Sequence, residues 1–199
     1  MYIFFILLLL CFLLPVFAVI SISIFCSSGR PIFFLQQRIG KDGKPFIMYK
    51  FRTMYRSAEK DQKKYVKQNE ANGPVFKIHN DPRFTPIGSF LSHTGLDELP
   101  QLWNVLYGDM ALFGPRPLPV SEAKLLLPWQ KERQQIKPGI LSPWIFNGYH
   151  RRTFDEWMRD DCMYVQKKSF FYDTQLFIRS CVFMITLFLQ EVLPTRRDH

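Results

Sequence analysis

Charged residues are missing from the first part of this 199-residue chain, because none occurs between Met1 and Gly29. A helix needs about 20 apolar residues to cross a bilayer, so this segment is long enough to enter a membrane. No basic region precedes the apolar run and no A-x-A site follows it, which argues against a secretory signal peptide. Pro15 lies in the middle and predicts a kink, because proline removes one helical hydrogen bond.

Two topologies fit this segment: a kinked transmembrane helix, and a re-entrant helix that bends at Pro15 and returns to the same face. Four basic residues follow the segment: Arg30, Arg38, Lys41 and Lys44. They predict that its C-terminal side lies in the cytoplasm. We therefore expect a membrane segment over residues 1–29 and a cytoplasmic, membrane-associated domain over residues 30–199.

Cysteine pairs and glycine-rich nucleotide loops are missing as well. The four cysteines form no C-x-x-C pair, so we interpret them as small reduced hydrophobic residues and not as zinc ligands. No G-x-G-x-x-G and no Walker loop occurs, so a nucleotide must be held by other means. Acidic residues are fewer than basic ones (17 against 26), and the net charge of +9 favours lipid surfaces or phosphorylated substrates. The aromatic residues cluster in apolar runs and not between basic ones, so we expect no nucleic-acid partner.

After the apolar segment, the chain predicts a β-hairpin. Residues 29–40 are expected to form a strand, residues 41–44 a turn, and residues 45–54 the returning strand. Lys50 and Arg52 are two residues apart and therefore share one face of the second strand. They form either a basic edge that meets phosphate or a solvated edge strand protected by charge.

Two adjacent carboxylates, Asp97 and Glu98, lie at the start of a short predicted helix, in or beside its first turn. The helix is indicated by four apolar residues with helical spacing: Leu99, Leu102, Trp103 and Leu106. Gly108 is a plausible end. The positive end of a helix favours ionised carboxylates, so the pair suits nucleophilic or metal-binding chemistry, although acidic residues also occur at helix starts for the dipole alone. Gly114-Pro115-Arg116-Pro117 then forms a stiff turn that presents one arginine, either to phosphate or to solvent.

The ordered run from Leu96 to Pro117 resembles the signature of bacterial sugar transferases, the monotopic phosphoglycosyl transferases, and the resemblance extends from about Leu8 to Leu189. Members transfer a phosphosugar from a nucleotide diphosphate sugar to a polyprenol phosphate. The other matching motifs are Tyr49-Lys50-Phe51-Arg52-Thr53-Met54, Asn80-Asp81-Pro82-Arg83, Lys137-Pro138-Gly139-Ile140, Asn147-Gly148, Asp161-Cys162-Met163-Tyr164-Val165 and Asp173.

The resemblance implies a ping-pong reaction at the dyad. Asp97 would attack the phosphorus that carries the sugar and also bind Mg²⁺, while Glu98 would activate or orient the acceptor or assist the metal. UDP and undecaprenyl phosphate are the expected nucleotide and lipid. The residues expected to contact substrate or phosphate are Lys50, Arg52, Arg116, Lys137, Gly139, Asn147, Arg151 and Asp173.

The resemblance also implies the fold and location. We expect an α/β (α+β-like) domain in which a small sheet and interfacial amphipathic helices accompany a re-entrant membrane helix. Membrane lipid is an expected partner, homo-oligomers are possible, and the location implied is the cytoplasmic face of a bacterial inner membrane.

The chain departs from the family pattern at three positions. Leu14 stands where a serine usually precedes the proline, and Ser92 and Tyr149 replace arginines. His93 or Arg83 could supply the charge that Ser92 lacks. Two alternatives therefore stay open: a transferase that works by direct displacement, and a non-catalytic membrane scaffold in polysaccharide assembly.

Overall fold

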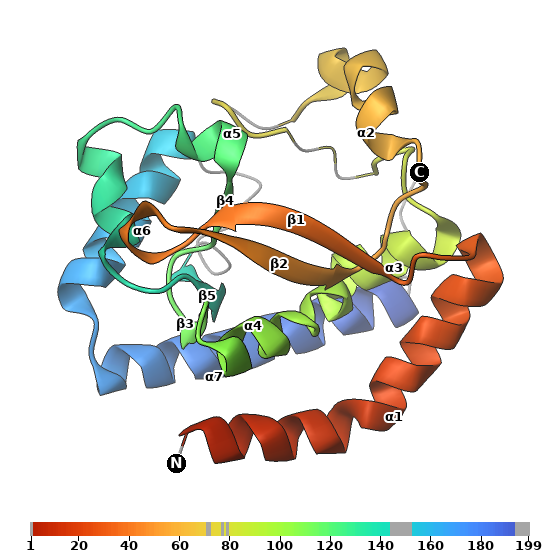
Figure 1. Cartoon of the computed structure of the whole chain (residues 1–199), viewed down its shortest axis with the longest axis horizontal. Helices are drawn as coiled ribbons and strands as arrows, with labels where there is room; N and C mark the ends of the chain where they lie inside the picture. The colour runs from red at the N-terminus through yellow and green to blue at the C-terminus, as the bar shows by residue number, and fades with distance from the viewer. Residues whose placement is uncertain (1, 71–72, 77, 79, 144–152, 194–199) are drawn as a thin grey trace.

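The N-terminal apolar segment forms one long helix, α1 (Tyr2–Ser28), which bends partway along its length (Figure 1). Pro15 lies inside it. The computed structural model describes residues 2–70, 73–76, 78, 80–143 and 153–193. The bend in α1 is consistent with the kink that Pro15 predicts from the sequence.

The expected hairpin forms the centre of the main sheet. Strands β1 (Phe33–Ile39) and β2 (Pro45–Phe51) pair antiparallel, and the turn between them contains Asp42 at a positive φ of 56°. The short strand β4 (Leu118–Pro119) adds to the other edge of β1, which gives the order β2-β1-β4. A separate parallel pair joins β3 (Ala111–Phe113) to β5 (Gly139–Leu141). The fold thus mixes helices with two small sheets.

The dyad segment folds as helix, turn and helix. Helix α3 (Pro86–Thr94) begins at Thr85, whose Oγ1 accepts a hydrogen bond from the N–H of Gly88. It ends at Gly95, whose φ of 74° reverses the chain. A 3₁₀ turn, η3 (Leu96–Glu98), then carries both carboxylates, and helix α4 (Gln101–Tyr107) follows. The dyad therefore precedes α4 in a turn of its own, because the proline at position 100 limits how far α4 can extend backwards.

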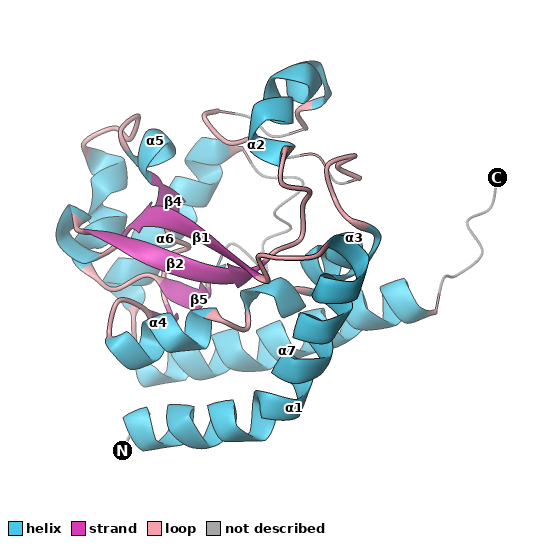
Figure 2. Cartoon of the chain, turned by 45° about the vertical axis from the view of Figure 1, so that its right-hand side comes forward, coloured by secondary structure: helices cyan, strands magenta, loops and turns pink. Residues whose placement is uncertain are grey.

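The remaining helices surround this centre. Helix α6 begins with a capping box at Thr153, and α7 begins at the Ser169 cap. Their bounds, with those of the short elements, are α2 (Ala58–Asp61), η1 (Lys41–Gly43), η2 (Gln62–Gln68), α5 (Val120–Ala123), η4 (Trp129–Gln135), α6 (Phe154–Lys167) and α7 (Phe170–Val192). In both views α1, α4 and α7 lie on one side of the main sheet, while α2 and α5 lie on the other (Figures 1 and 2).

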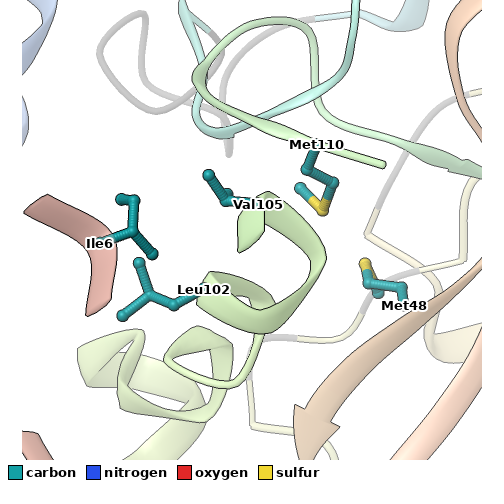
Figure 3. Close-up of a cluster of buried hydrophobic side chains, with 5 residues drawn as sticks. All are labelled: Ile6, Met48, Leu102, Val105 and Met110. Carbon is teal, nitrogen blue, oxygen red and sulfur yellow. The ribbon is translucent and has the colours of Figure 1, made fainter. Parts of the chain in front are cut away.

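Two hydrophobic clusters attach α1 to the domain. Near the start of α1, Ile6 packs beside Leu102 and Val105 of α4 (Figure 3), in a cluster that also contains Met48 of β2 and Met110, which precedes β3. Past Pro15, a second cluster joins α1 to β2 and α3: Phe17, Ile20, Ile24, Phe51 and Leu91. Because burial of apolar surface stabilises by about 25 cal/mol per Å², this inner face fixes α1 against the domain.

The outer faces of α1 and α7 remain apolar and exposed. On α1 these side chains include Phe4, Leu8, Phe12, Leu14, Val19 and Phe25, and on α7 they include Phe170, Phe177, Val182, Ile185 and Leu189. Both helices are long and apolar enough to cross a membrane, judged by length and composition only. Such a large apolar surface indicates contact with lipid or with another apolar partner.

Candidate active site

Three separate segments bring four charged side chains together. Strand β2 supplies Lys50, the turn η3 supplies Asp97 and Glu98, and the loop before β4 supplies Arg116. Each side chain is largely buried, since the exposed fractions are 14% for Lys50, 8% for Asp97, 17% for Glu98 and 24% for Arg116. Charges withdrawn from water in this way interact more strongly than on an open surface.

Glu98 forms ion pairs with both cations, Lys50 and Arg116. Its Oε1 lies 2.6 Å from Lys50 Nζ and 2.9 Å from the Arg116 guanidinium. Asp97 has a longer contact, with 3.4 Å between its Oδ2 and Lys50 Nζ. The two neighbouring carboxylates are therefore held differently: Glu98 is an anchor for two cations, and Asp97 is bound loosely beside it.

This difference separates the two pKa values. Burial raises the pKa of Asp97 to about 6, while the Lys50 ammonium opposes the rise and the Glu98 carboxylate adds to it. Burial also acts to raise the pKa of Glu98, but Arg116 and Lys50 overcome it and hold that pKa well below its usual range. A pair of neighbouring carboxyl groups with separated pKa values is typical of acid–base or nucleophilic sites.

A close contact between two glycines supports the arginine loop, which is the segment of residues 114–117 that carries Arg116. The Cβ of an alanine at position 139 would lie 2.0 Å from the backbone nitrogen of Gly114. The two backbone segments therefore approach so closely that only glycine fits. The Gly139 N–H donates to the Pro115 carbonyl oxygen at 3.0 Å. Gly139 thus brings its backbone close to the arginine loop, and its expected contact with a ligand stays a prediction.

The structure does not bring Arg52 to the dyad. Its Nη2 donates to the carbonyl oxygens of Ser28 and Gly29 at 2.8 Å each, and to Ser28 Oγ at 2.7 Å. Arg52 is 5% exposed. Through these hydrogen bonds it binds the C-terminal end of α1, where a cation is favourable. Of the two basic residues expected on one strand face, Lys50 contacts the dyad and Arg52 contacts the membrane helix.

Lys137 and Asp173 also lie apart from the dyad contacts. Lys137 Nζ lies beside Gly108, at the opposite end of α4 from the dyad. Asp173 accepts a hydrogen bond from the Tyr164 hydroxyl at 2.5 Å and pairs with Lys168 at 3.1 Å. These contacts join α6 to α7, so the substrate contacts expected of Lys137 and Asp173 stay predictions.

The two candidates for replacing the arginine absent at position 92 have other partners. His93 Nδ1 lies 2.9 Å from Glu191 Oε1, which links α3 to α7. Arg83 binds Asp81 with 2.6 Å between Nη2 and Oδ2, and also donates to the Ala58 carbonyl oxygen. In the described part of the chain, the cations that contact Glu98 are Lys50 and Arg116.

Sequence reasoning missed Asn104, which is fully buried. Its Oδ1 accepts from the Tyr49 N–H at 3.0 Å, and its Nδ2 donates to the Ile47 carbonyl oxygen at 2.6 Å. It therefore attaches α4 to the free edge of β2, next to Lys50. A polar residue within the apolar helix spacing was the signal that could have indicated it.

Two expected residues, Asn147 and Arg151, lie outside the described residues. Within the described ranges, no cluster of three or more His, Cys, Asp or Glu side chains could hold a metal ion alone. Mg²⁺ commonly uses one or two carboxylates together with substrate phosphates, and Asp97 and Glu98 match that arrangement.

A buried carboxylate pair with two cations, in a domain that packs against a long apolar helix, is an arrangement suited to phosphorus chemistry. The chain belongs to the bacterial sugar transferase family, which it matches over residues 1–187. It is 40% identical to a galactosyl transferase of Streptococcus agalactiae, over 86% of this chain and 38% of the relative.

Two further relatives differ in how much of their own length this chain matches. The chain is 38% identical to an uncharacterized sugar transferase of Bacillus subtilis, over 74% of this chain and 67% of the relative. It is 36% identical to the UDP-glucose:undecaprenyl-phosphate glucose-1-phosphate transferase of Escherichia coli, over 85% of this chain and 36% of that relative. The chain thus spans between about a third and two thirds of these relatives.

Proposed function

We propose that this protein transfers a sugar 1-phosphate from a nucleotide diphosphate sugar to a polyprenol phosphate. The products are a polyprenol diphosphosugar and a nucleoside monophosphate. UDP is the proposed nucleotide and undecaprenyl phosphate the proposed acceptor, supported by the activity for which the Escherichia coli relative is named. This would be the first membrane step in the synthesis of a polysaccharide or glycoconjugate.

The observation that carries the proposal is the unequal binding of the two carboxylates. Glu98 is neutralised by Lys50 and Arg116, whereas Asp97 is buried and, within the described part of the chain, forms one ion pair, a 3.4 Å contact with Lys50. A poorly solvated carboxylate that is only weakly paired with a cation is more basic and more nucleophilic than one in water. Asp97 is therefore the group proposed to attack.

The reaction proceeds in two displacements. A carboxylate oxygen of Asp97 forms a bond to the phosphorus that carries the sugar, the bond between the two phosphates breaks, and UMP leaves with the electron pair. An oxygen of the polyprenol phosphate then attacks the same phosphorus, and the bond to Asp97 breaks to restore the carboxylate. Each step exchanges one phosphorus–oxygen bond for another, so no oxidant or reductant is needed.

Lys50 and Arg116 are proposed to bind the phosphate oxygens during both steps. Both contact Glu98 Oε1, so a donor phosphate next to Asp97 would meet cations that are already in place. Positioned donors of this kind stabilise the charge of a transferring phosphoryl group. Glu98 is proposed to orient these cations and the acceptor.

Mg²⁺ is the proposed cofactor, held by Asp97 with the assistance of Glu98. When bound, it neutralises the diphosphate charge next to the carboxylates. The two adjacent carboxylates fit a metal that completes its coordination with substrate phosphate and water.

The proposed location is the cytoplasmic face of a bacterial inner membrane, with lipid as a partner. The exposed apolar faces of α1 and α7 would contact lipid, α7 lying at the membrane surface as an interfacial helix. Both halves of α1 pack on the same domain, Ile6 in the cluster with α4 and the residues past Pro15 in the cluster with β2 and α3, and this supports a re-entrant helix over a spanning one. Arg30, Arg38 and the lysines of the hairpin turn support a cytoplasmic domain.

The test is the intact mass of the protein after incubation with UDP-sugars and Mg²⁺ but without acceptor, while UMP is measured in parallel. We expect a mass gain equal to one phosphosugar, equimolar UMP, and loss of both in Asp97→Asn. Asp109→Asn, at the other end of α4, is the matched control and should keep the adduct.

The alternatives give different results in the same experiment. UMP that appears only when polyprenol phosphate is added, without an adduct, would indicate direct displacement. Folded protein that gives neither adduct nor UMP, with or without acceptor, would indicate a scaffold. Ser92→Arg would then test whether the substituted arginine limits activity.

A further inference from the structure

Three successive carbonyl groups in the arginine loop are held by three different elements. The Pro115 oxygen accepts from the Gly139 N–H of β5 at 3.0 Å. The Arg116 oxygen accepts from the Arg133 side chain in η4 at 2.5 Å, and the Pro117 oxygen accepts from Arg38 in β1 at 2.9 Å. Because prolines on both sides fix φ, this backbone has little freedom left.

Arg133 makes the most extensive of these contacts. Its guanidinium donates twice to Asp161 Oδ2, at 2.6 and 3.0 Å, as well as to the Arg116 carbonyl oxygen. It also lies over the Trp157 ring, 5.6 Å from the centroid. Arg133 is 4% exposed and Asp161 is fully buried, so the pair is a rigid support reaching from α6 to the arginine loop.

The other end of this loop reaches the dyad. The Arg116 backbone is bound by Arg133, and the Arg116 side chain is bound by Glu98 at 2.9 Å. A displaced carbonyl would therefore move the guanidinium relative to Glu98. A shift of about 1 Å at a positioned group can lower catalytic rate by up to about a hundredfold.

We propose that Arg133, oriented by Asp161, is a positioning residue that sets the location of the Arg116 guanidinium at the dyad. This rests on the proposed function, in which Arg116 binds phosphate oxygens. The hydrogen bonds of Arg133 go to Asp161 and to the Arg116 carbonyl oxygen, so it acts on the dyad through the Arg116 backbone. Its planar guanidinium can bind a carboxylate and a carbonyl together, which an ammonium does less well.

The chain contains a matched control. Arg83 is also buried, also pairs with an aspartate through its guanidinium, and also donates to a backbone carbonyl oxygen, that of Ala58. The hydrogen bonds of its side chain go to Asp81 and Ala58, away from the arginine loop. Arg83→Lys therefore makes the same chemical change at a site with a structural role only.

The experiment is a double-mutant cycle in the full-length protein. The rate of UMP release and the melting temperature are measured for wild type, Arg133→Lys, Arg116→Ala and the double variant. We expect Arg133→Lys to lower kcat/KM for the donor by roughly tenfold when Arg116 is present. In the Arg116→Ala background the same change should lower it by less than about twofold, because the group that Arg133 positions is gone.

The control cycle replaces Arg133→Lys by Arg83→Lys. Its effect on kcat/KM should be the same, within about twofold, in both backgrounds, because independent sites act additively. A tenfold loss in Arg133→Lys that persists unchanged in the Arg116→Ala background would overturn the positioning role while leaving the proposed function intact.

If the wild-type protein releases no UMP with any donor or acceptor, the proposed function fails and the melting temperatures decide the positioning role. Coupling between Arg133 and Arg116 should then appear as a departure from additivity of about 2 °C or more. Additive melting temperatures would refute it.

Discussion

Replacing Asp97 by asparagine should remove activity and at the same time stabilise the protein at neutral pH. The Asp97 carboxyl has a pKa raised from 3.8 to about 6, mainly by burial. Its ionised form is therefore less favourable in the folded protein than in the unfolded chain. The resulting loss of stability is absent below about pH 4, grows as the pH rises to 6, and is constant above.

The magnitude follows from the pKa difference. Each pKa unit corresponds to about 1.4 kcal/mol, so the ionised Asp97 lowers the free energy of unfolding by up to about 3 kcal/mol. Asparagine has nearly the same shape and no charge to desolvate. For a chain of this length, a gain of 1–3 kcal/mol would raise the melting temperature by about 3–10 °C.

Glu98 should behave in the opposite way. Its pKa is lowered by Arg116 and Lys50, so its charge adds stability that is present above the unfolded pKa and lost as the pH falls. Glu98→Gln leaves two buried cations without their anion and should lower the free energy of unfolding by about 2 kcal/mol or more. Adjacent residues of the same charge thus give changes of opposite sign.

The assay is thermal unfolding in detergent or nanodiscs at pH 4.5 and pH 7.5, followed by tryptophan fluorescence. We expect Asp97→Asn to be more stable than wild type at pH 7.5, with much of the gain lost at pH 4.5. Asp109→Asn is again the matched control. A melting temperature of Asp97→Asn that falls at pH 7.5, as expected for Glu98→Gln, would refute the unequal roles assigned to the dyad.

Three further predictions concern pH, the membrane helix and the glycine contact. The rate of adduct formation should fall as the pH drops through about 6, because protonated Asp97 cannot attack. A rate that does not change between about pH 5 and pH 7 would contradict this. Arg52→Met removes the donor to Ser28 and Gly29 and should lower the free energy of unfolding by about 2 kcal/mol, measured by chemical denaturation. Gly139→Ala forces a Cβ to within 2.0 Å of the Gly114 nitrogen and should cost about 3 kcal/mol or more, so it should unfold at markedly lower temperature than Gly43→Ala in the exposed hairpin turn.

Several elements could be predicted from local pattern. The hairpin of β1 and β2 and the end of α4 at Gly108 are confirmed, because strand alternation, turn residues and glycine caps act over a few residues. The apolar helix α1 is confirmed for the same reason. The family followed from the long ordered run around the dyad and is confirmed over residues 1–187.

Pairing across the fold was harder to predict. Lys50 and Arg52 share a strand face in the sequence pattern, yet one contacts Glu98 and the other the end of α1. Neither partner is close in sequence, and strand alternation says nothing about what packs against each end of a strand. The supporting contacts of Asn104 and Arg133 were missed for this reason.

The sequence by itself therefore determined the membrane-compatible helix, the hairpin, the dyad and the family, since each is written in spacing and composition over short segments. Only the tertiary structure decided which carboxylate is neutralised and which is left loosely bound. That difference arises from burial and from two cations on other segments of the chain: Lys50, which lies 48 positions before Glu98, and Arg116 in the loop before β4. Because pKa values depend on the solvent excluded and the charges nearby in space, two adjacent acidic residues have different roles only once the chain is folded.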